Sequence, residues 1–456
     1  MLNRLAALIL VVAGALAAAA TAGAQQGQGA GQGPQFILRA PSPLVDGICS
    51  RHGLVVTAVL RDDLVERIVE VTGPRDFSAD TIQSDVNSDD QVVDFEIDRP
   101  VRVPETTAAP SLNQSTAAIL EGVDTRTVVG FFGTQSINTY VSQPATGLIR
   151  LPATRPLVTG AGTVAIIDTG VDATHPLLRS VVLPGFDFTR NIAGTATDLI
   201  DLPQSTAAIL EQSTAAILEQ RSVVALNQST AAILEQSTAA ILEGQPPLPA
   251  SFGHGTMIAG LVHLVAPTAQ ILPLKAFRAD GSANVSNVIR AIYYAADRGV
   301  RVINMSFSLA EPSNELMKAV DYATSRGTSC VAAAGNQGKE MVVYPAGFRN
   351  VIAVGSTNNL DQRSAFSNFG DGIITLAAPG ESLITSFPGG RYAGVAGTSF
   401  STAFVTGAIS LMVQAWPGLT VRQAIEDLGR ATNVGQDLGY GRLDVYGTVS
   451  KSLLRH

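Results

Sequence analysis

The chain has 456 residues, 46% hydrophobic and 15% charged, so it can bury a full core and is long enough for about two or three domains. The formal net charge of −8 and the pI near 5.2 argue against nucleic acid or an anionic membrane surface as a partner. Aromatic residues make up only 5% of the chain, which also argues against a platform for stacking bases.

The N-terminus has the organisation of a secretory signal peptide, which we place at residues 1–24. One positive charge in MLNR precedes the apolar run LAALILVVAGALAAAA, and Ala22-Gly23-Ala24 has the small-x-small pattern of a cleavage site. An uncleaved membrane anchor is the alternative, but the run is short for a span. No later segment is long and apolar enough to cross a bilayer. We therefore expect a secreted protein, extracellular or periplasmic, that does not contact the membrane once the signal is removed.

Residues 35–103 are predicted to form a small α+β unit, preceded by a Gln/Gly linker at 25–34. Strand-like and helix-like segments follow one another in the order β-α-β-β-α-β, which is that of a split βαβ domain. The strands are FILRA, LVVTAVL, ERIVEVTG and VVDFEIDRPV, and the helices are SPLVDGICSRHG and SADTIQSDVNSD. Ser42 is a candidate cap of the first helix. Residues 104–135 lose this periodicity and are predicted to be a second linker.

The octad QSTAAILE occurs five times, once at 114–121 within this second linker and four times within 204–243. In a helix, eight residues advance about 800°, so successive Ile-Leu pairs spiral round the axis and form no coiled-coil stripe. The octads also place no Asp, His, Cys or Ser in a catalytic setting. We interpret 204–243 as a tolerated surface insertion. The alternative is an arm whose Ile-Leu pairs bind a partner.

The two cysteines, Cys49 and Cys330, lie in separate regions of the chain. An exported protein could pair them. Because Cys330 lies inside the apolar run SCVAAAGN, we expect two buried free thiols instead.

Residues 136–456 are predicted to form one α/β domain. Short apolar runs alternate there with helical patterns such as VSNVIRAIYYAADRG and SNELMKAVDYATSRG, which both end at Gly. The strand-like runs are GTVAIID, AQILPLKAF, RVINMSFS, SCVAAAGN, NVIAVGS and GIITLAAPG. They predict a doubly wound, mostly parallel sheet with helices on both faces. In such a sheet the functional site lies at the C-terminal ends of the strands.

Three side chains in this domain are candidates for catalysis. Asp168 in AIIDTGVD emerges from a buried strand into a turn, His254 in SFGHGTMIAG lies between glycines at the start of an apolar helix, and Ser399 in AGTSFSTAF opens a long apolar helix. His263 lies on the opposite face of the helix that carries His254, and His175 in THPLL has a structural setting. Taken singly, the Asp is more often a turn cap and the Ser an N-cap.

Taken together, the three residues supply what nucleophilic catalysis needs. A serine hydroxyl becomes a good nucleophile when an imidazole takes its proton, and a carboxylate fixes the tautomer of that imidazole. The helix N-terminus at Ser399 also favours developing negative charge. The chain order Asp, His, Ser is the order found in subtilisin.

The region from about residue 140 to 450 resembles the subtilisin-like serine peptidases, or subtilases. DTGVD, GHGT and GTSFSTAFVTG stand in register with three signature blocks of that family, and AAAGN is similar to the fourth. The resemblance implies a serine endopeptidase with the triad Asp168, His254 and Ser399. It also implies an oxyanion hole formed by Asn336 and the N–H of Ser399. Independently, Asn336 follows Gly335 at the end of a buried strand, where its amide could donate to an oxyanion; a left-handed turn is the alternative role.

The same resemblance implies the walls of the first specificity pocket, which are Ser306, Phe307 and Ser308 on one side and Ala333, Ala334 and Gly335 on the other. The chain departs from the family at three positions. The family usually has Pro and His where this chain has Ala403 and Phe404, and commonly has Gly in place of Ser308. Ala is a good helix former, so the first change should not harm the fold. A side chain at Ser308 is expected to narrow the pocket.

The N-terminal unit is similar in topology and position to the inhibitory propeptide of the family, which implies a zymogen whose own N-terminal domain acts as an intramolecular inhibitor. An unrelated accessory domain is the alternative. The expected partners are protein or peptide substrates. No cofactor or metal is required for the chemistry, and irregular structural calcium sites cannot be identified from the sequence. The rival functions are a non-catalytic binding module on a peptidase fold and an esterase, since an acyl-enzyme serves either an ester or an amide.

Overall fold

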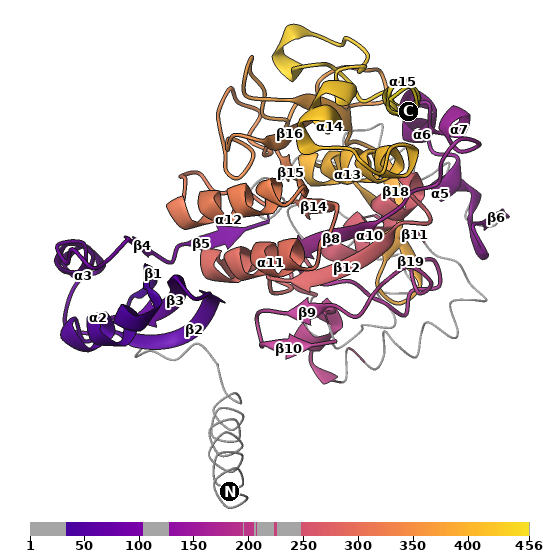
Figure 1. Ribbon diagram of the computed structural model, residues 1–456. Coiled ribbons are helices and arrows are strands. Elements are labelled where there is room, and N and C mark those ends of the chain that lie inside the picture. Colours follow the sequence, from indigo (N-terminus) through magenta and orange to yellow (C-terminus); the bar gives the residue numbers. More distant parts are fainter. Residues whose placement is uncertain are drawn as a thin grey trace, which may run out of the picture. The chain divides into compact units, whose positions relative to one another are not determined.

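The structure is a computed structural model that describes residues 33–103, 127–194, 196–204, 207, 223–225 and 248–455 (Figure 1). The chain divides into two units, of which the first ends at Ile97 and the second begins at Asp98. The predicted signal peptide, nearly all of the Gln/Gly linker, the octad at 114–121 and most of the insertion at 204–243 lie outside the described residues.

The first unit contains a four-stranded antiparallel sheet in the order β2-β3-β1-β4. The strands are β1 (Gln35–Pro41), β2 (Val55–Asp62), β3 (Glu66–Thr72) and β4 (Asp94–Ile97), and the helical segments are η1 (Ser42–Leu44), α2 (Val45–Arg51) and α3 (Ala79–Val86). A buried cluster that includes Phe36, Val69 and Phe95 fills the space between sheet and helices. The observed sequence of elements is the β-α-β-β-α-β order expected for this region.

Two details of the first unit differ from the sequence-based predictions. Ser42 does not cap α2; its Oγ donates to Asp63 O at 2.7 Å, which ties it to the turn after β2. The predicted last strand, VVDFEIDRPV, is divided. β4 ends at Ile97, and β5 (Pro100–Arg102) pairs instead with β13 (Ser282–Asn284) of the second unit. The break falls before Pro100, which has no N–H to continue a ladder.

The second unit is built on an eight-stranded sheet in the order β10-β9-β12-β8-β14-β15-β16-β17. All neighbours pair in parallel except β10 with β9. The strands are β8 (Thr163–Asp168), β9 (Phe186–Asp187), β10 (Ile192–Ala193), β12 (Gln270–Lys275), β14 (Val302–Met305), β15 (Ser329–Ala333), β16 (Val351–Thr357) and β17 (Leu376–Pro379). The continuous apolar runs predicted as strands all belong to this sheet, because both of its faces are covered.

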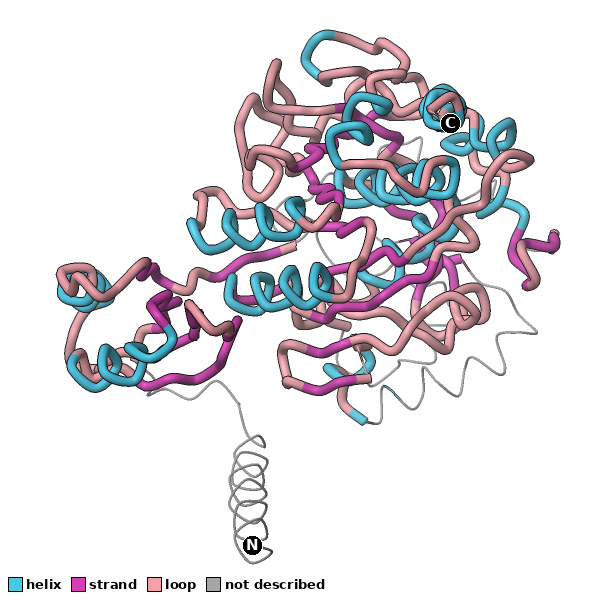
Figure 2. The backbone as a smooth tube through the Cα atoms, in the orientation of Figure 1, coloured by secondary structure: helices cyan, strands magenta, loops and turns pink. Residues whose placement is uncertain are grey.

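Helices lie on both sides of this sheet, which confirms the doubly wound α/β class (Figure 2). The first pair of helices, α10 (His254–Val265) and α13 (Thr398–Ala415), pack against each other, and a Cβ at Gly407 would meet Val265 Cβ at 2.6 Å. The second pair is α11 (Val285–Asp297) and α12 (Asn314–Ser325). Every residue of α13 except Gln414 is buried, so this helix is the centre of the core.

The remaining elements surround this framework. They are β6 (Val128–Phe131), β7 (Thr134–Ile137), α5 (Asn138–Val141), α6 (Pro144–Leu148), α7 (Leu151–Thr154), η3 (Asp198–Asp201), β11 (Val223–Ala225), β18 (Leu383–Phe387), β19 (Arg391–Val395), α14 (Val421–Leu428), η4 (Gln436–Leu438) and α15 (Val445–Leu453). β11, which lies in the spacer between octads, pairs in parallel with β19. Within the described part of the chain, no helix has the length and apolar character needed to span a bilayer.

The prediction of a linker over residues 104–135 is wrong for its last residues, which form the hairpin β6–β7. Phe132 and Gly133 have positive φ values of 42° and 82° and form the turn of the hairpin. The ring of Phe131 packs edge-on against Tyr140 and His263. This apolar anchor joins the hairpin to the core of the second unit.

Cys49 and Cys330 are both buried and free, as expected from the sequence. Burial raises the pKa of Cys330 to about 12 and also raises that of Cys49. Neither thiol therefore has the character of a nucleophile at neutral pH.

Candidate active site

The three candidate side chains come from one edge of the sheet, where the parallel strands end. Asp168 is the last residue of β8, and His254 is the first residue of α10. Ser399 is the second residue of α13. The rings of His254 and Phe400 lie 5.5 Å apart between centroids, so the starts of α10 and α13 are adjacent. The fold thus gathers residues that lie far apart in the sequence.

Asp168 and His254 form a direct pair. The Nδ1 of His254 lies 2.8 Å from Oδ1 and 3.0 Å from Oδ2 of Asp168, and both side chains are buried. Asp168 Oδ1 also accepts from Thr169 N at 2.7 Å. A carboxylate can only accept, so the ring proton lies on Nδ1 and the lone pair lies on Nε2. That is the tautomer that a general base requires.

The glycines beside His254 are required by packing. Gly253 has a φ of 84°, in the left-handed region that favours glycine. A Cβ at Gly255 would come within 2.1 Å of Gly170 O and 3.1 Å of Asp168 Cβ. The structure shows that Gly255 leaves room for the loop that follows Asp168.

Ser399 is held by reciprocal contacts with the segment after β14. Its Oγ donates to Ser306 O at 3.4 Å, and Ser306 Oγ donates to Ser399 O at 3.0 Å. The N–H of an N2 residue has no partner within its own helix, so that of Ser399 is a donor at the mouth of α13. Gly397, the N-cap of α13, has a φ of 150°, which allows the sharp entry into the helix.

Asn336 lies beside the start of the same helix. Its Oδ1 accepts from Thr398 N at 3.0 Å and from Thr398 Oγ1 at 2.8 Å. Because the amide oxygen faces Thr398, the Nδ2 group is directed away from that residue. Gly335 before it has a φ of 96°, and a Cβ there would meet Asn368 Nδ2 at 2.6 Å. The backbone turn that presents Asn336 is therefore tightly packed.

The predicted pocket walls leave adjacent strands. Ser306, Phe307 and Ser308 follow β14, whereas Ala333 ends β15 and Ala334 and Gly335 follow it. The two strands pair in parallel, so both segments emerge at the same edge. Phe307 is fully buried, with its ring 5.2 Å from that of Phe277. Its side chain supports the wall from within, and only its backbone can face a ligand.

Comparison with known proteins agrees with this geometry. Residues 160–447 match the model of the subtilase family, Peptidase_S8. The chain belongs to the subtilase family. This subtilase is 33% identical over 289 residues to a thermophilic serine proteinase from Bacillus sp. (strain AK1). The matched region covers 63% of this chain and 61% of that relative, so the chain spans less than two thirds of the relative's length. It is 30% identical over 314 residues to thermitase from Thermoactinomyces vulgaris, covering 66% of the chain and 93% of thermitase.

Solved structures agree on the fold. Fervidolysin from Fervidobacterium pennivorans superposes with a TM-score of 0.65 over 93% of this chain and 62% of its own, at 18% identity. Within the subtilase, the departures at Ala403 and Phe404 lie on α13, and both side chains are fully buried in the core. Neither residue disturbs the helix that carries Ser399.

Two further histidines of the second unit, His175 and His263, are both buried. His175 is buried, with Nε2 2.9 Å from Arg391 O. His263 lies inside α10, its ring 5.4 Å from Phe131, and burial lowers its pKa to about 4. Among the described residues, no group of three His, Cys, Asp or Glu side chains is arranged to hold a metal ion.

Sequence patterns did not reveal a segment that lies against the predicted pocket wall. β5 pairs antiparallel with β13, Ser308 N donates to Arg102 O at 3.4 Å, and Val103 N donates to Gly281 O at 3.1 Å. Upstream, Asp98 accepts from Ser286 N at 2.9 Å and from Ser286 Oγ at 2.7 Å, at the start of α11. The segment 98–103 is thus held at both ends, and its strand β5 lies between β13 and Ser308.

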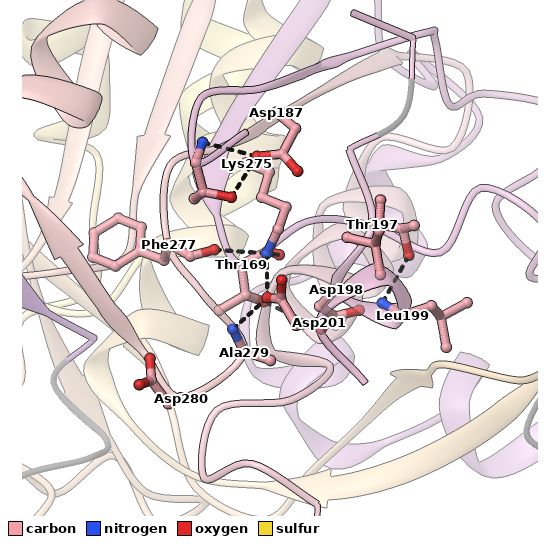
Figure 3. A network of polar contacts seen from close by, with 12 residues as sticks. Thr169, Asp187, Thr197, Asp198, Leu199, Asp201, Lys275, Phe277, Ala279 and Asp280 are labelled. Carbon is pink, nitrogen blue, oxygen red and sulfur yellow. Dashed lines mark hydrogen bonds and ion pairs between the residues drawn. The ribbon is translucent and has the colours of Figure 1, made fainter. Parts of the chain in front are cut away.

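A second feature without a sequence signal is a buried polar network around Lys275 (Figure 3). Lys275 Nζ is fully buried and donates to Thr169 O at 2.7 Å, to Phe277 O at 2.8 Å and to Asp201 Oδ2 at 2.7 Å. Asp201 Oδ2 also accepts from Ala279 N at 2.7 Å. Asp198 lies close by, and burial raises its pKa to about 7, against the opposing effect of Lys275. No local sequence signal marks these residues, because their partners come from separate segments.

Proposed function

We propose that this subtilase is a secreted serine endopeptidase, made as a zymogen, that hydrolyses peptide bonds through Asp168, His254 and Ser399. The observation that carries the proposal is the contact between both oxygens of Asp168 and Nδ1 of His254 at 2.8 and 3.0 Å, beside the helix that begins at Ser399. The relatives named above, a serine proteinase and thermitase, support the reaction type.

The proposed chemistry follows the tautomer of His254. Its Nε2 takes the proton of Ser399 Oγ as this oxygen attacks the peptide carbonyl, and Asp168 stabilises the imidazolium that forms. The N–H of Ser399 and the Nδ2 of Asn336 donate to the oxyanion. His254 then gives its proton to the leaving amine. Water repeats the sequence on the acyl-enzyme, which releases the acid and restores the serine.

The zymogen proposal rests on the segment 98–103. Its strand β5 pairs antiparallel with β13, which is the way an extended peptide adds a strand to an exposed sheet edge. The segment follows directly on the first unit, which ends at Ile97. We infer that the N-terminal unit is an intramolecular inhibitor whose trailing segment occupies the place of substrate. Self-cleavage is expected within the first few residues after Val103.

Peptide hydrolysis by the wild-type protein and by Ser399→Ala tests the function. We expect turnover of a chromogenic peptide by the wild type and none by the variant, with unchanged circular dichroism. Equal turnover by both proteins would disprove the role of Ser399. A wild type that binds peptides without cleaving them would instead indicate the binding module, and one that cleaves only esters would indicate the esterase.

N-terminal sequencing of the secreted protein tests the zymogen proposal. The wild type should begin after Val103, whereas Ser399→Ala should retain the first unit. A mature wild-type protein that still carries residues 35–97 would contradict the proposal.

A further inference from the structure

Asp198 connects the two halves of the Asp168–His254 pair. It lies in η3, is fully buried, and has no role in the chemistry proposed above. One oxygen, Oδ2, accepts a short hydrogen bond from Gly253 N and a second from Thr169 Oγ1 at 3.3 Å. Gly253 directly precedes His254, and Thr169 directly follows Asp168. A single carboxyl oxygen therefore contacts the neighbour of each residue.

A second path leads from the same carboxyl to the other side of His254. Thr169 Oγ1 accepts from Gly255 N at 3.1 Å while it donates to Asp198. The backbone N–H groups on both sides of His254 are thus fixed, one by Asp198 directly and one through Thr169. Both N–H groups belong to the first turn of α10, where a helix lacks internal acceptors.

Close packing holds η3 against the loop after β8. Val171 N donates to Ala196 O at 2.7 Å. A Cβ at Gly170 would lie 2.8 Å from Ala196 O and 2.8 Å from Asp198 N. The backbone of Asp198 cannot shift without moving the loop that follows Asp168. The carboxyl group therefore has a fixed position, and loss of its hydrogen bonds would allow His254 to move.

The charges that face Asp198 come from three elements. Lys275 on β12 favours its ionised form, whereas Asp201 on η3 and Asp172 after β8 disfavour it. Arg190 and Lys275 both contact Asp201 and partly offset its charge. Asp198 Oδ1 accepts no hydrogen bond from any described residue. Burial dominates and raises the pKa of Asp198 to about 7.

We propose that Asp198 is a positioning residue of this peptidase, which holds Asp168 and His254 in register and whose ionisation adds a second acidic group to the pH dependence of turnover. The proposal rests on the proposed function. Hydrogen bonds to a carboxylate are stronger than those to a neutral acid. The hydrogen bonds from Gly253 and Thr169 to Asp198 are therefore strongest above pH 7. They weaken as the pH falls and Asp198 takes up a proton.

The test compares Asp198→Asn and Asp198→Ala with wild type by kcat/KM for a chromogenic peptide from pH 5 to pH 9. Asn keeps one acceptor oxygen but cannot ionise. At low pH the logarithm of kcat/KM should fall with a slope of about one in Asp198→Asn, where only protonation of His254 lowers it. In wild type it should fall more steeply than that over the pH range in which Asp198 also takes up a proton. Asp198→Ala should lose about 10- to 100-fold in kcat with little change in KM, because the reacting groups are misplaced.

Asp427→Asn is the matched control, because Asp427 is also fully buried but bonds to Arg455 and Ser452, far from His254 in the sequence. The pH dependence of kcat/KM in Asp427→Asn should have the wild-type slope even if the substitution lowers stability. Wild-type slopes and rates in both Asp198 variants would overturn the positioning role alone. A wild type that cleaves no peptide would overturn the proposed function and this proposal with it. If Asp198→Ala fails to fold, the slope of Asp198→Asn still decides.

Discussion

The carboxylate of Asp168 contacts the Nδ1 of His254 with both oxygens, at 2.8 and 3.0 Å. Its Oδ1 is also the acceptor for Thr169 N. In Asp168→Asn the amide oxygen should keep that place, so the NH2 group would occupy the position of Oδ2 and face His254. A donor there forces the ring proton onto Nε2 and removes the general base.

Asp168→Asn should therefore fold normally and lose about 10,000-fold in kcat. Steady-state kinetics on a peptide substrate provide the measurement, with thermal unfolding as the check on folding. A loss of less than about tenfold would mean that the pair does not set the tautomer used in catalysis.

Asn336 should be needed for the rate of the reaction and not for substrate binding. Asn336→Ala should lower kcat by about 100- to 1,000-fold with little change in KM, because the oxyanion loses one donor. Asn336→Asp separates this role from a structural one. The carboxylate can still accept from Thr398 N and Oγ1, but it cannot donate. Recovery of wild-type kcat in Asn336→Asp would show that Asn336 serves only to hold Thr398.

His263 should make the fold sensitive to acid. Burial lowers its pKa to about 4, below the value near 6.5 of an unfolded chain. Between these values the unfolded state binds more protons, so stability falls as the pH drops from about 6.5 to 4.

His263→Phe, made in a Ser399→Ala background to prevent autolysis, should resist this acid effect. The difference in unfolding free energy between this variant and its Ser399→Ala parent should be measured at pH 8 and at pH 5. It should be about 2 kcal/mol more in favour of the variant at pH 5 than at pH 8. The phenyl ring can keep the edge contact with Phe131. Chemical denaturation at the two pH values measures the difference, and parallel loss of stability in both proteins would contradict the assignment.

The proposed triad could be predicted because each member has a local signal. Asp168 ends an apolar run, and His254 and Ser399 lie in the first turns of apolar helices that follow a glycine. Asp198 has no such signal. Its partners Thr169 and Gly253 lie 29 and 55 residues away, and only folding brings them together. For the same reason Lys275 could be predicted as part of a strand but not as the centre of a network.

The sequence periodicity of the last predicted strand does not reveal that the strand is divided between two units. Phe95 and Val101 both fit an alternating strand, yet they are buried in different units. Asp98 lies between the two strands, and its carboxylate bonds to Ser286, which is 188 residues away. Periodicity reports that a residue is buried, but not which core buries it.

The octads should be dispensable one at a time. Deletion of Gln212 to Glu219 joins Glu211 to Gln220 and leaves β11 intact. Loop-closure free energy changes by only about 0.6 kcal/mol per doubling of length, so stability should be near wild type. Secretion, processing and small-peptide turnover are the measurements. A large loss of turnover in a folded protein would show that the insertion shapes the active site, and loss of a partner alone would favour the arm.

Labelling by a fluorophosphonate probe tests the central claim most directly, because the probe reacts only with a serine that a neighbouring base activates. The measurement is the intact mass of protein isolated after loss of its first unit, followed by mapping of the modified peptide. We predict one label per chain, on Ser399, with none in Ser399→Ala and strongly slowed labelling in His254→Ala. Processed, folded wild-type protein that takes up no label on Ser399 would contradict the account.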